Sequence, residues 1–564
     1  MKLKNRTKKL GVGILSLVVA LSCFPACGGS GNGGSSKTTT EIEFANYQGC
    51  AGNVWLKEAA ARFSALKAEE TYESGKKGVT INVTDLKATP YTTINSEGYD
   101  IYIGENKANI YAMASSGYLL DLSEVAQGIE SKIDKDAIKR LKGADGKYYG
   151  LPSYEWYTGV TYDQDFFTEE NLYLAAPEET GRTVYSKFGA LKLVSSENDK
   201  KSCGPDGVYN TEDDGMPSSL MEFVSLMDII KNNTDRSPFI ISGGSIDYAF
   251  FLVDALWASL AGTEQIKTIY SLDSKGEEIV EVVTGFSNED LFYSGSGIKK
   301  PITEKIAIDE ENGYKIYDMA SRYYGFATLQ LIYKEGWFVD EFLNSSTKTN
   351  VAAQYTFVNE KKAAILYDAS FWCSESVRNG DFNMYAKLNP DNPERNVSFM
   401  AMPVTIDTPV TEGNGVRQAL LDVGAAQLFV SKRVENNEGK KKAVIDFLKF
   451  LYSDAELAAF TESTGLKIPI SYEYDDSNLN DYYKKLNKYV RESDVIYFAS
   501  DSVVVNKNLE SFALTWSSSI NKPTIDSITY GNGYLDAMKN AGADCVTIFE
   551  ATRKTKSAWD ALKK

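Results

Sequence analysis

The order of apolar segments in the first part of the chain constrains the fold most. Residues 41–47 (EIEFANY) alternate between apolar and polar side chains and stop near a glycine, which is typical of a β-strand. Residues 54–66 repeat their apolar side chains at helical spacing, residues 79–86 return to a strand pattern, and residues 99–103 form a short apolar strand before a helix at 110–120. Strands that alternate with helices predict an α/β domain with a largely parallel sheet.

The remainder of the 564-residue chain keeps this alternation, with two interruptions. Residues 176–218 are rich in glycine and proline and predict an inserted loop region. Residues 262–312 are rich in charge and predict a second insertion that is partly β-structure. Between the two, helical spacing returns, as in the apolar stretch 250–260. The length exceeds that of one typical domain, so we expect at least two.

The N-terminus has the regions of a signal peptide. Residues 1–9 hold five cations, and residues 10–22 are uncharged and mostly apolar, a stretch too short for a comfortable membrane-spanning helix. Cys27 follows the sequence FPA and precedes a run of glycine and serine. This arrangement resembles the lipobox of bacterial lipoproteins, in which the cysteine thiol takes a diacylglycerol and becomes the new N-terminus.

The lipobox resemblance predicts a signal peptide at residues 1–26, a lipid anchor on Cys27 and a flexible tether at residues 27–40. Cys23 stands in a competing context and stays an alternative anchor site. Acyl chains hold a protein stably at a membrane surface, because each buried CH₂ contributes about 0.8 kcal/mol. We therefore expect the protein at the extracellular face of a bacterial cytoplasmic membrane, with the lipid as its contact to the bilayer.

Composition excludes several classes of function. The chain contains no histidine, which rules out Ser–His and Cys–His catalysis and His-ligated zinc. Its formal net charge is −17, which argues against nucleic acid as a partner, because phosphates repel an acidic surface. Beyond the leader, the cysteines are widely spaced without a CxxC pair, so no metal site is expected and their pairing in disulfides stays open: Cys50, Cys203, Cys373 and Cys545.

Six segments resemble, in the same order, motifs of bacterial extracellular solute-binding proteins of family 1, the maltodextrin-type sugar binders of ABC transporters. Residues 99–122 include YDIYI and SGYLLDL, and residues 145–152 read DGKYYGLP. The four later segments are residues 161–167 (TYDQDFF), 357–372 (FVNEKKAAILYDASFW), 430–452 and 465–469 (GLKIP). The resemblance runs from about residue 41 to the C-terminus.

This resemblance implies an α/β chain with the two-lobe, type II periplasmic-binding-protein-like fold, in which each lobe is a mostly parallel sheet flanked by helices and a hinge joins the lobes. Lobe 1 would comprise residues 41–155 plus 415–472, and lobe 2 residues 156–414 plus 473–564. The chain would cross between the lobes near residues 151–158, 402–423 and 469–474. The ligand would lie in the cleft between the lobes, and hinge closure around a ligand is a known conformational switch.

A sugar presents apolar C–H faces and a rim of hydroxyl groups, so its site needs aromatic platforms and polar side chains that hydrogen-bond the rim. Open α/β sheets bind ligands at the carboxyl ends of their strands. With the resemblance, these requirements select thirteen candidate ligand contacts: Tyr47, Gln48, Glu105, Asn106, Tyr154, Glu155, Trp156, Tyr157, Asp247, Tyr248, Phe371, Trp372 and Trp516. For the aromatic candidates, packing in the core or at the hinge is the alternative.

A glycine-bounded acidic loop at residues 206–215 (DGVYNTEDDG) is a candidate calcium site, formed by Asp206, Asn210, Asp213 and Asp214. Hard oxygen ligands at short spacing suit Ca²⁺. The loop lacks the glutamate at the twelfth position of an EF-hand, so an ordinary acidic surface turn is the alternative. No other cofactor is expected.

Together these observations predict a monomeric, non-enzymatic binding protein of an ABC importer, which captures a carbohydrate, by resemblance an oligosaccharide, and delivers it to the membrane permease. The solute can instead be a peptide, a polyol or an amino sugar. A secreted glycosidase that uses paired carboxylates also needs no histidine, although no glycosidase motif is visible among the 77 acidic residues. A structural or adhesive lipoprotein would be expected to show repeats, which we do not find.

Overall fold

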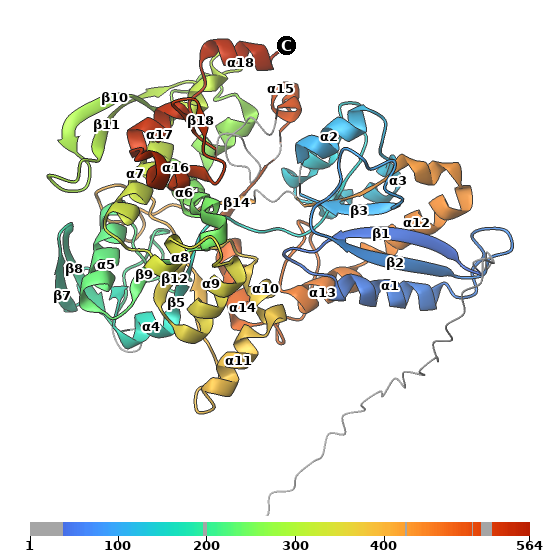
Figure 1. Ribbon diagram of the computed structural model, residues 1–564, viewed down its shortest axis with the longest axis horizontal. Coiled ribbons are helices and arrows are strands. Elements are labelled where there is room, and N and C mark those ends of the chain that lie inside the picture. The colour runs from blue at the N-terminus through green and yellow to red at the C-terminus, as the bar shows by residue number, and fades with distance from the viewer. Residues whose placement is uncertain (1–37, 106, 196–199, 423–425, 499, 509–521) are drawn as a thin grey trace, which may run out of the picture.

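The computed structural model describes residues 38–105, 107–195, 200–422, 426–498, 500–508 and 522–564. The predicted signal peptide, Cys27 and most of the tether therefore lie outside the described residues, as do Asn106 and Trp516. Figure 1 shows two lobes side by side: one built mainly from the first part of the chain, and a larger one built from the middle and the end.

The five-stranded sheet of lobe 1 has the order β2-β1-β3-β15-β4. β1 (Thr40–Tyr47) pairs in parallel with β2 (Val79–Leu86) over its whole length and also with β3 (Ile101–Gly104). β15 (Gln427–Val430) is antiparallel both to β3 and to β4 (Leu151–Pro152). The three strands expected in the first part of the chain are confirmed.

Helices cover both faces of this sheet. Because side chains alternate along a strand, Phe44 points to one face, where it meets Phe447, whereas Ala45 and Tyr102 belong to a second apolar cluster on the other face. The helices and single turns of lobe 1 are α1 (Val54–Leu66), α2 (Lys107–Ser115), α3 (Ser123–Ala126), η1 (Glu130–Lys132), η2 (Ala137–Leu141), η6 (Lys432–Asn436), α12 (Glu438–Leu451) and α13 (Asp454–Thr464).

Lobe 2 is built on a four-stranded sheet of order β13-β5-β12-β9. β12 (Ala363–Leu366) is parallel to β9 (Ser237–Ile240) but antiparallel to β5 (Thr161–Asp163), which is antiparallel to β13 (Val397–Phe399). Both sheets are therefore mixed, which corrects the expectation of mostly parallel sheets. The physical reason is where the chain crosses between the lobes. β5 and β15 are the first strands after such a crossing, so each runs away from the other lobe and pairs antiparallel with its neighbours.

The helices of lobe 2 surround this sheet. Helix α5 begins with a capping box, in which the Ser219 hydroxyl accepts from the Glu222 amide and the Glu222 carboxylate accepts from the Ser219 amide. The elements are α4 (Gln164–Glu169), α5 (Leu220–Asn233), η3 (Gly243–Ala249), α6 (Phe250–Ser271), η4 (Gly313–Asp318), α7 (Ala320–Lys334), α8 (Asp340–Leu343), α9 (Asn350–Tyr355), η5 (Thr356–Glu360), α10 (Trp372–Asn379), α11 (Asp381–Leu388), α14 (Asp481–Glu492), α16 (Gly533–Ala541), α17 (Cys545–Ala551) and α18 (Lys556–Leu562), with the small strands β17 (Thr524–Ile525) and β18 (Ile528–Thr529).

Helix α6 is the central helix of lobe 2. It continues past the predicted end at residue 260, through a kink at Gly262 (φ +75°), to Ser271. Together with η3 it is, among the described residues, the one stretch long and apolar enough to pass as a membrane span, but 72% of its apolar window is buried inside the fold. It packs against α7 and therefore serves as a core helix.

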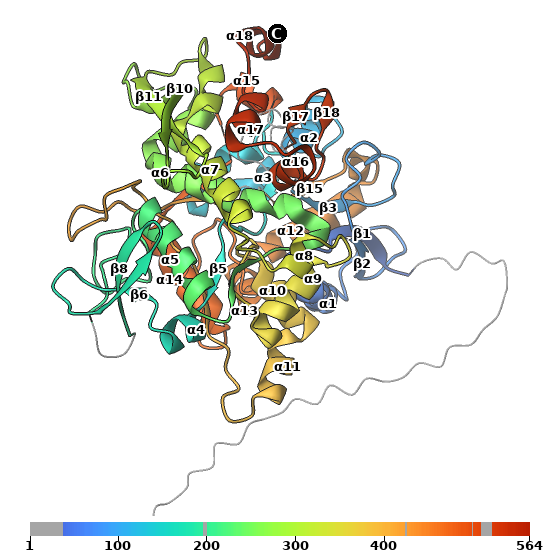
Figure 2. The same cartoon turned by 60° about the vertical axis from the view of Figure 1, so that its left-hand side comes forward.

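Both predicted insertions form β-structure on lobe 2, away from β1 and β2 (Figures 1 and 2). The first carries most of a small sheet made of β6 (Tyr173–Leu174), β8 (Gly189–Val194) and β7 (Arg182–Ser186). The second forms the hairpin of β10 (Val280–Asp290) and β11 (Lys299–Ile306). The first insertion is thus more ordered than the expected loop region, because β8 packs against α5.

The segments that cross between the lobes are hydrogen-bonded to one another. On the first crossing, the Glu155 amide donates to the carbonyl of Lys467 on the third crossing (2.8 Å). On the second crossing, β14 (Ala419–Asp422) pairs in parallel with β16 (Asp494–Tyr497) and packs against α6. After β16, α15 (Val503–Lys507) contacts α2, so the C-terminal part returns to lobe 1 at this point.

Candidate ligand-binding cleft

The first crossing presents two different faces to its surroundings. In an extended chain, successive side chains point in opposite directions. Tyr154 and Trp156 share one face, where the Tyr154 hydroxyl and the Trp156 indole N–H both donate to Oε1 of Glu105, at 3.1 and 3.3 Å. Glu155 and Tyr157 share the opposite face and bond to each other at 2.9 Å. The face that carries Trp156 is the one that looks onto both lobes.

Glu105 lies at the end of β3, where the parallel strands of lobe 1 point towards lobe 2. Burial raises the pKa of its carboxyl to about 7, against the opposing effect of the donors Tyr154, Trp156 and the Cys50 thiol. All three donors reach Oε1. Among the described residues, Oε2 accepts no hydrogen bond, which leaves it for a guest.

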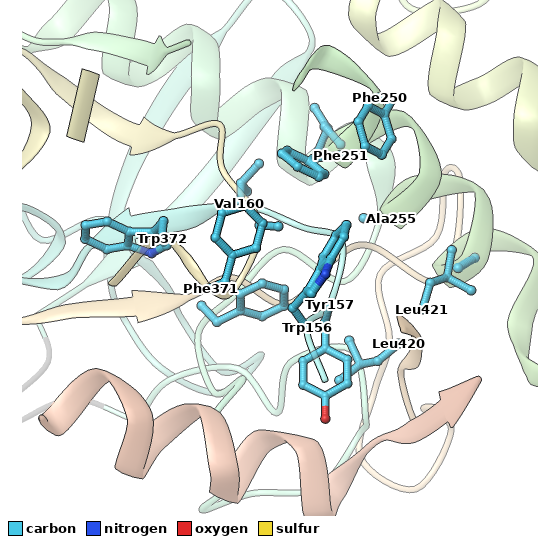
Figure 3. Close-up of a cluster of buried hydrophobic side chains, with 14 of the residues drawn as sticks. Trp156, Tyr157, Val160, Phe250, Phe251, Ala255, Phe371, Trp372, Leu420 and Leu421 are labelled. Carbon is cyan, nitrogen blue, oxygen red and sulfur yellow. The ribbon is translucent and has the colours of Figure 1, made fainter. Parts of the chain in front are cut away.

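Aromatic rings from both sides meet at Trp156 (Figure 3). Its ring packs edge-to-face on Phe371, at 5.4 Å between centroids, and on Phe251 of α6, at 5.9 Å. Tyr248, just before α6, packs on Phe251 at 4.9 Å and is half-buried. Trp156, Phe251 and Phe371 are buried here, at 1%, 0% and 5% exposed, so they can offer the apolar platforms that a sugar face requires only when the lobes move apart.

Helix α10 of lobe 2 touches the loop that follows β1 of lobe 1. The Cys50 amide donates to Oε1 of Glu375 (3.4 Å), and Arg378 donates to the Cys50 carbonyl. Gly52 lies beside this contact with φ +67°, and a Cβ there would come within 2.9 Å of Arg378 Cδ. The positive φ favours glycine at residue 52, and a larger residue there would also displace the end of the Arg378 side chain.

Behind this contact, one amide links two carboxyl groups. Nε2 of Gln354 donates to Asp368 at 3.0 Å and to Glu375 at 3.1 Å. Burial raises the pKa of both carboxyls, and the charge of Glu375 raises the pKa of Asp368 further. Gln354 is fully buried, and its carbonyl oxygen has no partner among the described residues.

Tyr47, at the end of β1, stands between carboxylates of the two lobes. The charge of Glu105 raises the pKa of its hydroxyl most, followed by burial and by the charges of Cys50 and Glu375. Its ring folds over Gly49, where a Cβ would lie 2.6 Å from the ring. The contact region between the lobes, where the ligand cleft is expected, therefore combines aromatic rings, carboxylate acceptors and contributions from both lobes.

No protein-family model matches the sequence, and no curated protein matches it. Solved structures do. A chitin oligosaccharide binding protein has a TM-score of 0.53 at 14% identity, with 93% of this chain and 99% of that chain covered. A structure described in connection with xylan utilization by Caldanaerobius polysaccharolyticus has a TM-score of 0.54 at 13% identity, with 91% of this chain and 99% of that chain covered. The GacH receptor of Streptomyces glaucescens, solved unliganded and with acarbose, has a TM-score of 0.51 at 13% identity, with 93% and 98% covered.

The chain has the two-lobe fold of solute-binding proteins. The expected fold class is thereby confirmed, and the resemblance inferred from six sequence segments is supported at the level of the fold. At 13–14% identity the likeness is one of architecture, so the cleft contents must be argued from this chain's own residues.

In this solute-binding fold, Glu155 and Tyr157 belong to the hinge rather than to the cleft. Glu155 accepts hydrogen bonds from the hydroxyls of Tyr157 (2.9 Å) and Tyr497 (2.6 Å). Beside them, Arg140 and Asp422 form an ion pair of 2.6 Å with both side chains fully buried. Of the four candidates at 154–157, strand alternation places Tyr154 and Trp156 on one side and Glu155 and Tyr157 on the other.

A polar cavity of about 580 Å³ lies on the hinge face, between η2 of lobe 1 and the end of α6. Its lining mixes lysines with carboxylates, and Lys139 pairs there with Asp136 and Asp501, each at 3.2 Å. The lining carries five carboxylates and three lysines, and Tyr270 and Tyr497 are its aromatic residues.

Trp372 lies in the core of lobe 2 rather than in the cleft. Its ring is 0% exposed, packs against Phe357 and Tyr482, and its N–H donates to the Thr161 hydroxyl at 2.8 Å. No face of the ring is left for a ligand, because the first turn of α10 directs it inward. Its neighbour Phe371 takes the place beside Trp156 (Figure 3).

The remaining candidates fall into three groups. Gln48 is exposed just beyond β1, and Asp247 is half-buried before α6, where burial raises the pKa of its carboxyl. Asn106 and Trp516 lie outside the described residues. Sequence reasoning missed several residues that line the contact between the lobes: Cys50, Phe251, Gln354, Asp368, Glu375 and Arg378. Glu375 and Arg378 carry a signal in the sequence, since they follow Trp372 at helical spacing.

The carboxylates of the acidic loop accept hydrogen bonds from the loop's own backbone amides. Asp213 accepts from the Asp206 amide (3.0 Å), and Asp214 accepts from the Asn210 amide (2.8 Å). Within the described residues, no group of three or more cysteine, aspartate or glutamate side chains is arranged to hold a metal ion. The four later cysteines are buried free thiols: Cys50, Cys203, Cys373 and Cys545.

Proposed function

We propose that this protein is the extracellular substrate-binding lipoprotein of an ABC importer, and that it captures a carbohydrate between its lobes for delivery to the membrane permease. The observation that carries the proposal is the group around Trp156: aromatic rings and carboxylate oxygens from both lobes meet at the end of β3. Aromatic faces accept the C–H faces of a sugar, and carboxylates accept its hydroxyl protons.

The geometry favours binding over catalysis. Oε1 of Glu105 accepts one hydrogen bond from Tyr154 and one from Trp156, and these bonds hold the carboxylate in place as part of the cleft wall. The solved structures of the same fold include one named a chitin oligosaccharide binding protein and one named a receptor that was solved with acarbose. A hinged cleft that closes on a sugar without altering it accounts for both the fold and the side chains.

A thermal-shift screen over oligosaccharides, followed by chromatography of the recovered sugar, tests this proposal. A ligand at 100 times its Kd adds about 2.7 kcal/mol to the free energy of unfolding and raises the melting temperature. We expect at least one oligosaccharide to do so and to be recovered intact. A screen in which every saccharide leaves the melting temperature unchanged would remove the carbohydrate assignment, and released product would replace it with a glycosidase.

The anchor belongs to the proposal as well. Metabolic labelling of the expressing bacterium with a radioactive fatty acid should label the wild-type protein, and Cys27→Ala should abolish the label. The matched variant Cys23→Ala should keep it. If Cys23→Ala loses the label instead, the anchor lies four residues earlier; if neither variant loses it, the lipobox assignment is wrong.

A further inference from the structure

The cleft region contains several carboxyl groups that form no ion pair among the residues that the structure describes. Four carboxyl groups face it or stand directly behind it: Glu105, Asp247, Asp368 and Glu375. Burial and the charges of Asp368, Glu375 and Asp247, in that order, raise the pKa of the Tyr248 hydroxyl, so three of the four surround this one group. The charges of Glu105 and Glu375 likewise raise the pKa of the Tyr47 hydroxyl.

None of these four carboxylates forms an ion pair with another described residue. Arg378, the nearest arginine, uses its guanidinium on the Cys50 carbonyl and, at 2.9 Å, on the Ser374 hydroxyl. Its charge lowers the pKa of Glu375 only against the larger opposite effect of burial.

Elsewhere some buried carboxylates pair with arginines, whereas others, such as Asp254, form no ion pair and have a raised pKa. Asp163 meets Arg395 at 2.6 Å with both side chains fully buried, and Asp100 lies 2.8 Å from Arg433. Buried carboxylates are costly without such a partner. The cleft region gathers four carboxyls of the unpaired kind, and the buried carbonyl oxygen of Gln354, without a partner among the described residues, adds one more acceptor.

We infer that the solute carries a protonated amine, which seats between Glu105 of lobe 1 and Glu375 of lobe 2. An ammonium group has three donors and no acceptor, so it satisfies an excess of acceptors, and its charge favours the ionised form of carboxyls whose pKa burial raises. The rings of Tyr47, Tyr248 and Trp156 add cation–π attraction. This inference rests on the proposed function, and within it the solute is an amino sugar.

Calorimetric titration with three matched tetrasaccharides tests the inference. The β-1,4-linked oligomers of glucose, N-acetylglucosamine and glucosamine differ at one ring position, which carries a hydroxyl, an acetamide or an amine. At a pH where the amine is protonated, we expect the glucosamine oligomer to bind at least about tenfold tighter than the other two, and its affinity to fall with added salt. Equal affinities, or tighter binding of either neutral oligomer, would overturn the amine while leaving carbohydrate capture intact.

The variant Glu375→Gln keeps the size of the side chain and removes its charge. We expect it to reduce the preference for the amine about tenfold while the neutral oligomers bind as before. Glu341→Gln is the matched control, since Glu341 pairs with Lys362 on the surface of the same lobe at 2.7 Å. If Glu375→Gln fails to fold, Asp247→Asn, at a half-buried position, replaces it. An unchanged preference in the folded variant contradicts the inference.

A titration with spermidine separates the amine from the sugar. Binding of spermidine, without binding of any saccharide, would support the amine and overturn carbohydrate capture. Failure of both spermidine and every saccharide would overturn the two proposals together.

Discussion

Trp156 makes polar and apolar contacts at once. Its N–H donates to Glu105, and its ring packs on Phe251 and Phe371. We expect Trp156→Ala to weaken saccharide binding by about 2 kcal/mol, roughly 30-fold, because buried aromatic anchors dominate recognition. Trp156→Phe should retain part of the affinity, since it keeps a ring and loses the N–H. Calorimetric titration measures both, and wild-type affinity in Trp156→Ala would contradict this role.

Asp254, on the buried side of α6, gives the stability a specific dependence on pH. Burial raises the pKa of its carboxyl to about 8, against the opposing charge of Arg322. The folded protein therefore holds a proton that the unfolded chain releases near pH 4, and stability falls as pH rises from about 4 to 8.

The variant Asp254→Asn removes this carboxyl while it keeps the shape of the side chain. We expect a flatter pH profile for the variant, with a gain relative to wild type of at least about 2 kcal/mol at pH 8 compared with pH 5. Urea unfolding at the two pH values provides the measurement. Parallel profiles for the two proteins would show that Asp254 is not responsible.

For single residues, the sequence indicates which residue types form the candidate site better than it indicates which way their side chains point. It identifies the aromatic run at 154–157 but does not reveal that Glu155 and Tyr157 lie on the opposite face of the crossing from Tyr154 and Trp156. It also does not distinguish Phe371 from Trp372, because the inward direction of the latter depends on packing in the core of lobe 2. Glu375 and Arg378 become visible only when α10 meets the Cys50 loop.

Among the elements, the hinge holds a fully buried polar group. Arg140 from η2 and Asp422 from β14 form a fully buried ion pair, next to Glu155 and Tyr497. Removal of one partner leaves a buried charge, so we expect Asp422→Leu to cost about 3–5 kcal/mol. The double variant Arg140→Met/Asp422→Leu should recover most of that loss in urea unfolding. If the double variant is as unstable as the single one, the pair is not the cause.

The helices and strands also show which parts of the fold can be predicted from local sequence pattern alone. The first three strands and α1 follow directly from alternation and helical spacing, because each has one clear apolar face. The direction of β5 and β15 is not local information, since it depends on where the chain enters each lobe, and this is why the sheets are mixed. The hairpins of lobe 2 likewise depend on packing against α5 and α7.

For the whole molecule, the contact between the Cys50 loop and α10 decides how closely the lobes approach. We expect Gly52→Ala to weaken saccharide binding at least about fivefold and to leave the liganded protein with a larger radius of gyration in solution scattering, because the new Cβ meets Arg378. Gly117→Ala is the matched control: its φ is +72°, and a Cβ there has no atom within 4 Å. Equal effects of the two variants would mean that backbone strain, and not lobe contact, is responsible.

The most direct measurement is a crystal structure of the mature protein with the saccharide that binds it. The account predicts electron density for the sugar between the lobes, with a ring face against Trp156 or Phe371 and a donor group on Oε2 of Glu105. A saccharide bound elsewhere on either lobe, with the group around Trp156 unchanged, would contradict it.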